Sequence, residues 1–158
     1  MEKGADFSPC RRYRYTLWRL WGGARGYLMF IGLNPSTADE VQDDPTVRRC
    51  IGYARDWGYS GLWMTNIFAY RATKPDDMKA VADPEGPEND RWLGQVAAGA
   101  ELVVAAWGTH GAYRDRHQRV RDLLPQLHYL RLTQEGYPAH PLYLPKSLLP
   151  IPWPVAQA

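Results

Sequence analysis

Residues 27–39, YLMFIGLNPSTAD, pass from a continuously apolar run into a loop that places an amide directly before a proline. The apolar run is typical of a strand buried on both faces, because it leaves no side for solvent. Asn34 and Pro35 stand where that strand ends. Both residue types are common in turns and Asn caps helices well, so a purely structural role for the pair is one interpretation.

Apolar runs and helical patterns alternate along the rest of the chain. We predict central strands at about residues 27–32, 61–67, 101–107 and 128–133. We predict helices within residues 43–59, 89–100 and 113–127, the first with an acidic cap and a proline at its first position. Residues 12–21 are expected to form an edge strand in a hairpin with 27–33, residues 71–89 a long polar loop, and residues 135–154 a Pro-rich tail.

This alternation predicts an α/β fold, a three-layer α/β/α sandwich with a central, mostly parallel sheet of four or five strands. The 158 residues fit a single domain, with its core at about residues 12–153. In such sheets ligands bind where loops leave the carboxyl ends of the strands.

Composition excludes some classes of protein. The net charge of +2 is far below that of a dedicated electrostatic DNA-binding protein, although it permits contact with a polyanion. Two cysteines, Cys10 and Cys50, are expected to be free thiols in a reducing, cytoplasmic compartment. No apolar stretch approaches the length of a membrane span, and we expect no membrane association.

Polar side chains follow several of the predicted strands. Asn66 ends the strand at 61–67, and a buried amide there must find partners for its donors and acceptor. Asn34 and Asn66 at one sheet edge suggest a site that reads a planar polar ring, whereas the alternative is that Asn66 only ties down its own loop. His140, after the last predicted strand, is either a structural loop residue or a third member of this site.

Other kinds of site have little support in the sequence. The four histidines have no tight ligand spacing, so we expect no metal site. No Walker loop, dinucleotide fingerprint or nucleophile elbow is present in the sequence, and we expect no cofactor.

Four short motifs carry a resemblance to known families. IGLNPS, MTNIFAYRATKPDDM, LVVAAWG and HPLYL resemble, in order and approximate spacing, motifs of the uracil-DNA glycosylase superfamily. The first two look most like its mismatch-specific and thymine-DNA branches. The chain from about residue 12 to 153 is also similar to an uncharacterised bacterial and phage family, domain-of-unknown-function family 1643, with GLNPSTAD, DDPTVRRC, TNIFAYRAT and HPLYLP as its signature.

The glycosylase resemblance implies roles for individual residues. Asn34 would orient a water beneath the sugar carbon, while Gly32, Pro35 and Ser36 shape the base-binding floor. Asn66 would form a hydrogen bond with the edge of an extruded, pyrimidine-like base, and His140 would stabilise negative charge on the departing base. Extrusion needs a wedge, for which Tyr143 and Leu144 are the best candidates, and the alternative is that both serve packing of the tail. The implied partner is nucleic acid, DNA foremost, or a nucleotide.

The sequence also departs from that superfamily. GLNPS has no counterpart of the water-activating acid, Ser36 replaces a usual glycine, and the cysteines of an iron–sulfur cluster are absent from the sequence, so no cluster is expected. Asp43 and Asp44 are either helix caps or part of the pocket. The candidate phosphate contacts are basic residues, namely Arg11, Arg12, Arg48, Arg49, Arg71 and Lys146.

These observations leave three hypotheses open. The first is a hydrolase that cleaves the N-glycosidic bond of a base, normal or modified, in nucleic acid or a nucleotide. The second is a non-catalytic reader of a modified base or nucleotide that uses the same pocket. The third is a phage or mobile-element accessory protein whose old pocket now serves a protein interface, in which case Asn34 and Asn66 would be dispensable.

Overall fold

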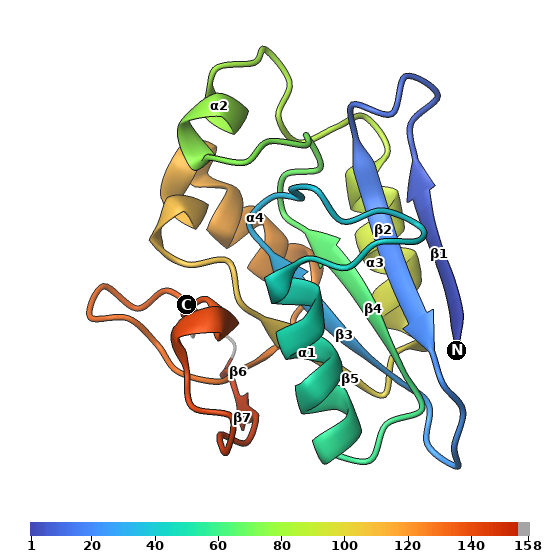
Figure 1. Ribbon diagram of the computed structural model, residues 1–158. Helices are drawn as coiled ribbons and strands as arrows, with labels where there is room; N and C mark the ends of the chain where they lie inside the picture. Colours follow the sequence, from blue (N-terminus) through green and yellow to red (C-terminus); the bar gives the residue numbers. More distant parts are fainter. Residues whose placement is uncertain (155–158) are drawn as a thin grey trace.

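The computed structural model describes residues 1–154 and shows an α/β fold built on one seven-stranded mixed sheet (Figure 1). The strands lie in the order β1-β2-β4-β3-β5-β6-β7. Their bounds are β1 Glu2–Phe7, β2 Arg14–Leu20, β3 Tyr27–Gly32, β4 Gly61–Asn66, β5 Leu102–Ala105, β6 His128–Tyr129 and β7 Ile151–Pro152.

Four central strands, β4, β3, β5 and β6, run parallel, and β1, β2 and β7 join them antiparallel. The predicted central strands therefore occur. The expected count of four or five strands is wrong, and the sheet is mixed rather than mostly parallel throughout, because antiparallel strands extend it on both sides.

Helices cover both faces of the sheet. Their bounds are α1 Pro45–Asp56, α2 Pro75–Lys79, α3 Asn89–Gly99 and α4 Arg116–Leu123, with 3-10 turns η1 at Thr109–Asp115 and η2 at Pro141–Tyr143. α1 packs on the face that carries Leu28, Phe30 and Met64. α3 and α4 pack on the opposite face, against Met29 and Ile31 (Figure 1). β3 is thus buried on both faces, as its continuous apolar run predicts.

α1 begins where the sequence predicts. The Asp44 side chain accepts a hydrogen bond of 2.9 Å from the Val47 N–H, and Pro45 occupies the first turn. Such a cap contributes about 1 kcal/mol, and proline costs nothing there because that N–H has no intrahelical partner.

The predicted hairpin between residues 12–21 and 27–33 is wrong. β2 pairs with β1 on one side and with β4 on the other, so β4 separates it from β3. β1, whose polar sequence EKGADF gave no strand pattern, takes the edge position expected for β2.

Three further boundaries differ from the sequence predictions. β6 ends at Tyr129, because residues 131–139 fold back on themselves through bonds such as Ala139 N–H to Arg131 O, at 2.8 Å. The loop at 71–89 contains α2, anchored by the buried Met78. The Pro-rich tail contributes β7 to the sheet.

Candidate functional site

The carboxyl ends of β3 and β4 lie side by side and fix where their loops begin. Gly32 stands opposite Asn66 in the parallel register. The loops then stay together, since Ile67 N–H donates to Gly32 O and Phe68 N–H to Leu33 O, both at 2.9 Å. Polar residues that follow these two strands are therefore held at one edge of the sheet.

A cavity of about 410 Å³ opens at this edge, between the strand ends, the start of α1 and η2. Its lining includes all three residues that the sequence singled out, Asn34, Asn66 and His140. They are far apart in sequence and converge because β3, β4 and the segment before η2 end on the same side of the sheet. Gly32, Pro35, Ser36 and Tyr143 also line this cavity.

Asn34 is held by its amide nitrogen. Its Nδ2 donates to Pro35 O at 3.1 Å and to Ala72 O at 2.8 Å, which ties its loop to the segment after β4. No donor among the described residues bonds its Oδ1. Asn34 thus has a structural role through one end of its amide and offers an acceptor through the other.

Asn66 is almost fully buried, with 4% of its surface exposed, yet its Nδ2 has no hydrogen-bond partner among residues 1–154. Its loop is tied instead by Asn89, whose Nδ2 donates to Asn66 O and Ile67 O. The amide fits because Gly32 has no side chain, since a Cβ there would lie 2.7 Å from Asn66 Oδ1. The interpretation that Asn66 only secures its own loop therefore loses its support.

His140 precedes η2 and its Nδ1 accepts a hydrogen bond of 3.2 Å from the Leu142 N–H. An accepting Nδ1 places the proton of a neutral imidazole on Nε2. Burial lowers the pKa of His140 below its ordinary value, against the opposing effect of the Asp44 charge. His140 is consequently a neutral ring with an Nε2–H donor at neutral pH.

Asp43 and Asp44, adjacent in sequence, have different environments. Asp43 pairs with Arg19 at 2.8 Å. Asp44 caps α1 and also lines the cavity, so the two alternatives left open by the sequence both apply to it.

Arg14, at the start of β2, is a cavity residue that the sequence analysis missed. β2 has a register shift against β1, where Asp6 pairs with Thr16 but Phe7 pairs with Arg14. The extra residue, Tyr15, reverses the alternation and brings Arg14 to the face that Leu17 and Arg19 share. Burial lowers the pKa of Arg14 to about 10, against the opposing charge of Asp44, so the guanidinium remains charged at neutral pH.

Two basic hollows adjoin the cavity. One, of about 550 Å³, is lined by Arg48, Arg49 and Lys146 and shares Pro45 and Leu142 with the cavity. The other, of about 400 Å³, is lined by Arg11, Arg12 and Arg71 and shares Ser36, Thr37, Ala72 and Thr73 with it. The candidate phosphate contacts therefore lie on two sides of the cavity.

The two wedge candidates, Tyr143 and Leu144, differ in their exposure. Tyr143 is 85% exposed and lines the cavity. Leu144 is 6% exposed and packs in the core with residues of α1, which agrees with the alternative of tail packing and not with a contact to nucleic acid.

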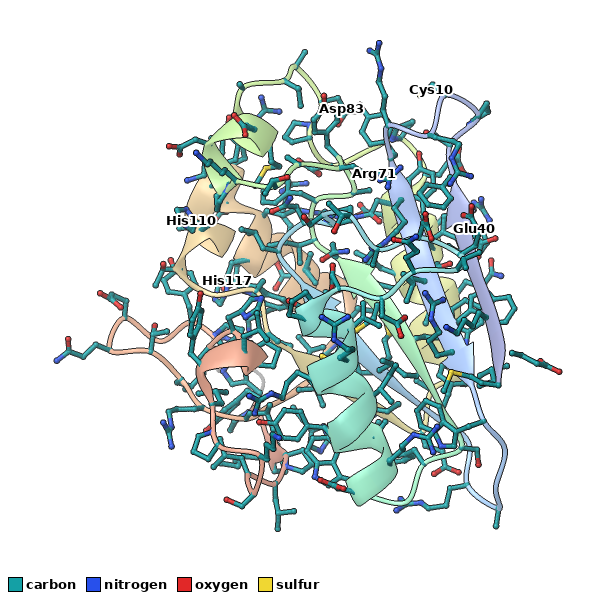
Figure 2. The ribbon with its side chains drawn as sticks, in the orientation of Figure 1. Cys10, Glu40, Arg71, Asp83, His110 and His117 are labelled. Carbon is teal, nitrogen blue, oxygen red and sulfur yellow. The ribbon has the colours of Figure 1, made fainter. Side chains whose placement is uncertain are left out.

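The described residues contain no group of three His, Cys, Asp or Glu side chains that could hold a metal ion. His110 and His117 lie on the side of the molecule that carries α4, away from Arg71 (Figure 2). The His117 Nδ1 accepts from the Trp107 indole at 2.9 Å. Both cysteines are free thiols, Cys10 exposed and Cys50 buried. No helix within residues 1–154 has the length and apolar character needed to span a membrane.

The chain belongs to the family described as "Protein of unknown function (DUF1643)", which matches residues 14–142. The match begins at Arg14 and also includes Asn34, Asn66 and His140, which line the cavity with it. No curated protein and no solved structure matches the chain.

Proposed function

We propose that the cavity binds a base of nucleic acid, DNA foremost, or of a nucleotide, and that the protein hydrolyses the N-glycosidic bond of that base. One observation carries the proposal: an acceptor on Asn34, a donor on Asn66 and a neutral imidazole on His140 line one cavity of about 410 Å³. Cavities of this size enclose small ligands, and a few converging polar groups orient them.

Asn34 positions the attacking water in this proposal. Its Nδ2 is fixed by two backbone carbonyls, which leaves Oδ1 as a rigid acceptor for a water proton. The water oxygen forms a bond to the sugar C1′, the C1′–N bond breaks with its electron pair on the base, and the water proton passes to solvent or to the base. An amide is a weak base, so positioning must supply much of the rate.

His140 stabilises the departing base. Its neutral ring donates from Nε2 to an oxygen or nitrogen on which charge develops, the principle of an oxyanion hole. The Leu142 N–H, held on Nδ1, maintains the tautomer that this role requires.

Asn66 reads the edge of the base. Its buried Nδ2 lacks a partner, and a base carbonyl or ring nitrogen would supply one. Gly32 provides the space for the amide, and Pro35 and Ser36 complete the floor of the site.

A nucleic-acid strand would cross the cavity between the two basic hollows. Arg48, Arg49 and Lys146 would contact phosphates on one side, and Arg11, Arg12 and Arg71 on the other. Tyr143, exposed at the cavity, would fill the space left by an extruded base. A uracil-DNA-glycosylase-like architecture is part of this proposal, supported by the parallel centre of the sheet and by helices on both faces.

The proposal is tested by incubating the protein with oligonucleotides and nucleosides that carry a panel of normal and modified bases, and by measuring released base by mass spectrometry. Asn34→Ala should lower kcat by about a hundredfold while affinity changes little, because water positioning acts in the transition state. Gln95→Ala, which removes an exposed amide on α3, serves as the control and should leave both unchanged. Equal release by Asn34→Ala and wild type would refute the catalytic role.

The second candidate is a non-catalytic reader of the same base. It is favoured by the presence of an amide, rather than an acid, in the loop that would hold the water. Tight binding of a base or nucleotide without release of any base from the panel would establish it in place of the hydrolase.

A further inference from the structure

Three arginines are buried within residues 1–154, and two of them are fully partnered. Arg19 donates to Asp43 at 2.8 Å and to the carbonyls of Asp39 and Gln42, at 2.6 and 3.2 Å. Arg116 donates to Asp90 at 2.6 Å and to Ile67 O at 2.8 Å, and it pairs with Glu85 at 3.4 Å. Such partners are the normal condition for a cation removed from water.

Arg14 is the exception. It is 3% exposed, and its side chain forms one hydrogen bond, from Nη1 to Ala38 O at 3.0 Å. Its Nε is buried without a partner, and no carboxylate of the described chain pairs with it. Asp44 acts on Arg14 through its charge and lines the same cavity, but its Oδ1 is engaged by the Val47 N–H.

The free edge of this guanidinium has a definite shape. The bond from Nη1 to Ala38 leaves the Nε and Nη2 donors, which lie parallel along one edge. That edge matches two oxygens of a carboxylate or phosphate. The two charge-assisted hydrogen bonds so formed are stronger than hydrogen bonds between neutral groups.

A second residue with an unpartnered donor, Asn66, lines the same cavity. The Nδ2 of Asn66 is buried and unpaired within the described chain, and the Arg14 backbone N–H donates to Ala69 O at 3.0 Å, which sets Arg14 beside the segment that leaves β4. Arg14 on β2 and Asn66 on β4 therefore line the same cavity, and each has a buried donor without an acceptor in the described chain.

We infer that Arg14 and Asn66 form a subsite for an oxyanion carried by the ligand, a carboxylate or a phosphate. The inference rests on the proposed function only in taking this cavity as the ligand site. Asp44 lines the same cavity, and its negative charge repels an oxyanion, so the favourable position for the oxyanion is directly against Arg14. A ligand that meets these donors carries negative charge, either on a substituent of the base or on the phosphate of a mononucleotide.

Titration calorimetry with matched probes tests the subsite. Uracil is compared with uracil-6-carboxylate, and uridine with uridine 5′-monophosphate, at constant ionic strength. We expect at least one anionic probe to bind the wild type tenfold or more tightly than its neutral counterpart. The pair that shows the preference identifies the source of the oxyanion, a substituted base or a phosphate.

Two variants attribute the preference to Arg14. Arg14→Met should abolish it, and Arg14→Lys, which keeps the charge but lacks the paired donors, should restore only part of it. Arg91→Met removes the same charge from an exposed position on α3 and should leave the preference intact. If Arg14→Met does not fold, the wild type provides a second measurement, since the preferred anion should raise its Tm where chloride at equal ionic strength does not.

Equal affinity for the charged and neutral members of both pairs, with no rise in Tm, would overturn the subsite. Retention of the preference by folded Arg14→Met would also overturn it. Base release by a wild type without any preference for anions would refute the subsite and leave the proposed hydrolase intact. An Arg14-dependent preference without base release would support the subsite and refute the hydrolase.

Discussion

Each end of β2 carries a buried arginine, and the two arginines differ in how many of their donors have partners. Arg19 lies among acceptors that the chain itself supplies, and its partner Asp43 is 20% exposed. Arg14, on the same face, lies against a cavity with one acceptor bonded and its Nε unpaired. Both hold the loop that follows β3, Arg14 at Ala38 and Arg19 at Asp39.

The difference separates structural charge from functional charge. A buried cation with a full set of partners can be explained by the fold that it holds together. A buried cation with free donors lowers stability, because the lost hydration is not fully replaced. Such a residue at a cavity is better explained by a ligand than by the fold.

The largest loss of stability is expected at Arg19, the buried arginine of β2 that has its full set of partners. Arg19→Met should lower the free energy of unfolding by about 3 kcal/mol, because it leaves Asp43 and several carbonyls without their donor. Urea unfolding measures it, with Arg91→Met, at an exposed ion pair, as a control that should lose less than about 1 kcal/mol. A loss at Arg19 no larger than at Arg91 would remove the distinction between structural and surface charge.

A smaller loss of stability is expected at Asp44, where two substitutions separate the effect of the helix cap from the effect of the charge. Asp44→Ala should cost about 1 kcal/mol, because it removes the cap on Val47 N–H. Asp44→Asn keeps a capping oxygen and removes only the charge beside Arg14, so we expect it to recover most of that loss. An Asp44→Asn protein as unstable as Asp44→Ala in urea would show that the charge, and hence an interaction with Arg14, matters more than the cap.

Much of this arrangement was predictable from local sequence. β3 matches its predicted bounds, and β4 matches within one residue, because each is a bounded apolar run. α1 begins at Pro45 because cap and proline are encoded in adjacent positions. Asn34 and Asn66 converge because strand ends in a parallel sheet share an edge, which needs only the order of the elements. His140 reaches the same cavity from the segment before η2, which does not follow directly from a strand.

The parts that were missed depend on contacts that the local sequence does not specify. Alternation along β2 places Arg14 opposite to Arg19, and only the shift at Tyr15 reverses it. That shift is a property of the pairing between β1 and β2, and β1 itself was not predicted. Leu144 was assigned from a motif, whereas its burial depends on where η2 packs against α1. Position along a motif therefore gave the candidate residues, and pairing decided which of them face the cavity.

The smallest change in stability is expected at Arg14, the buried arginine of β2 that has donors without partners. Arg14→Met should alter the free energy of unfolding by less than about 1 kcal/mol without ligand, since one lost bond to Ala38 O is offset by removal of a poorly solvated charge. The two side chains are similar in length, so packing of the side-chain stem at the cavity wall is largely kept. Urea unfolding of Arg14→Met beside Arg19→Met gives the direct test. A loss near 3 kcal/mol at both positions would make Arg14 a structural arginine, and its free donors would then need no ligand to explain them.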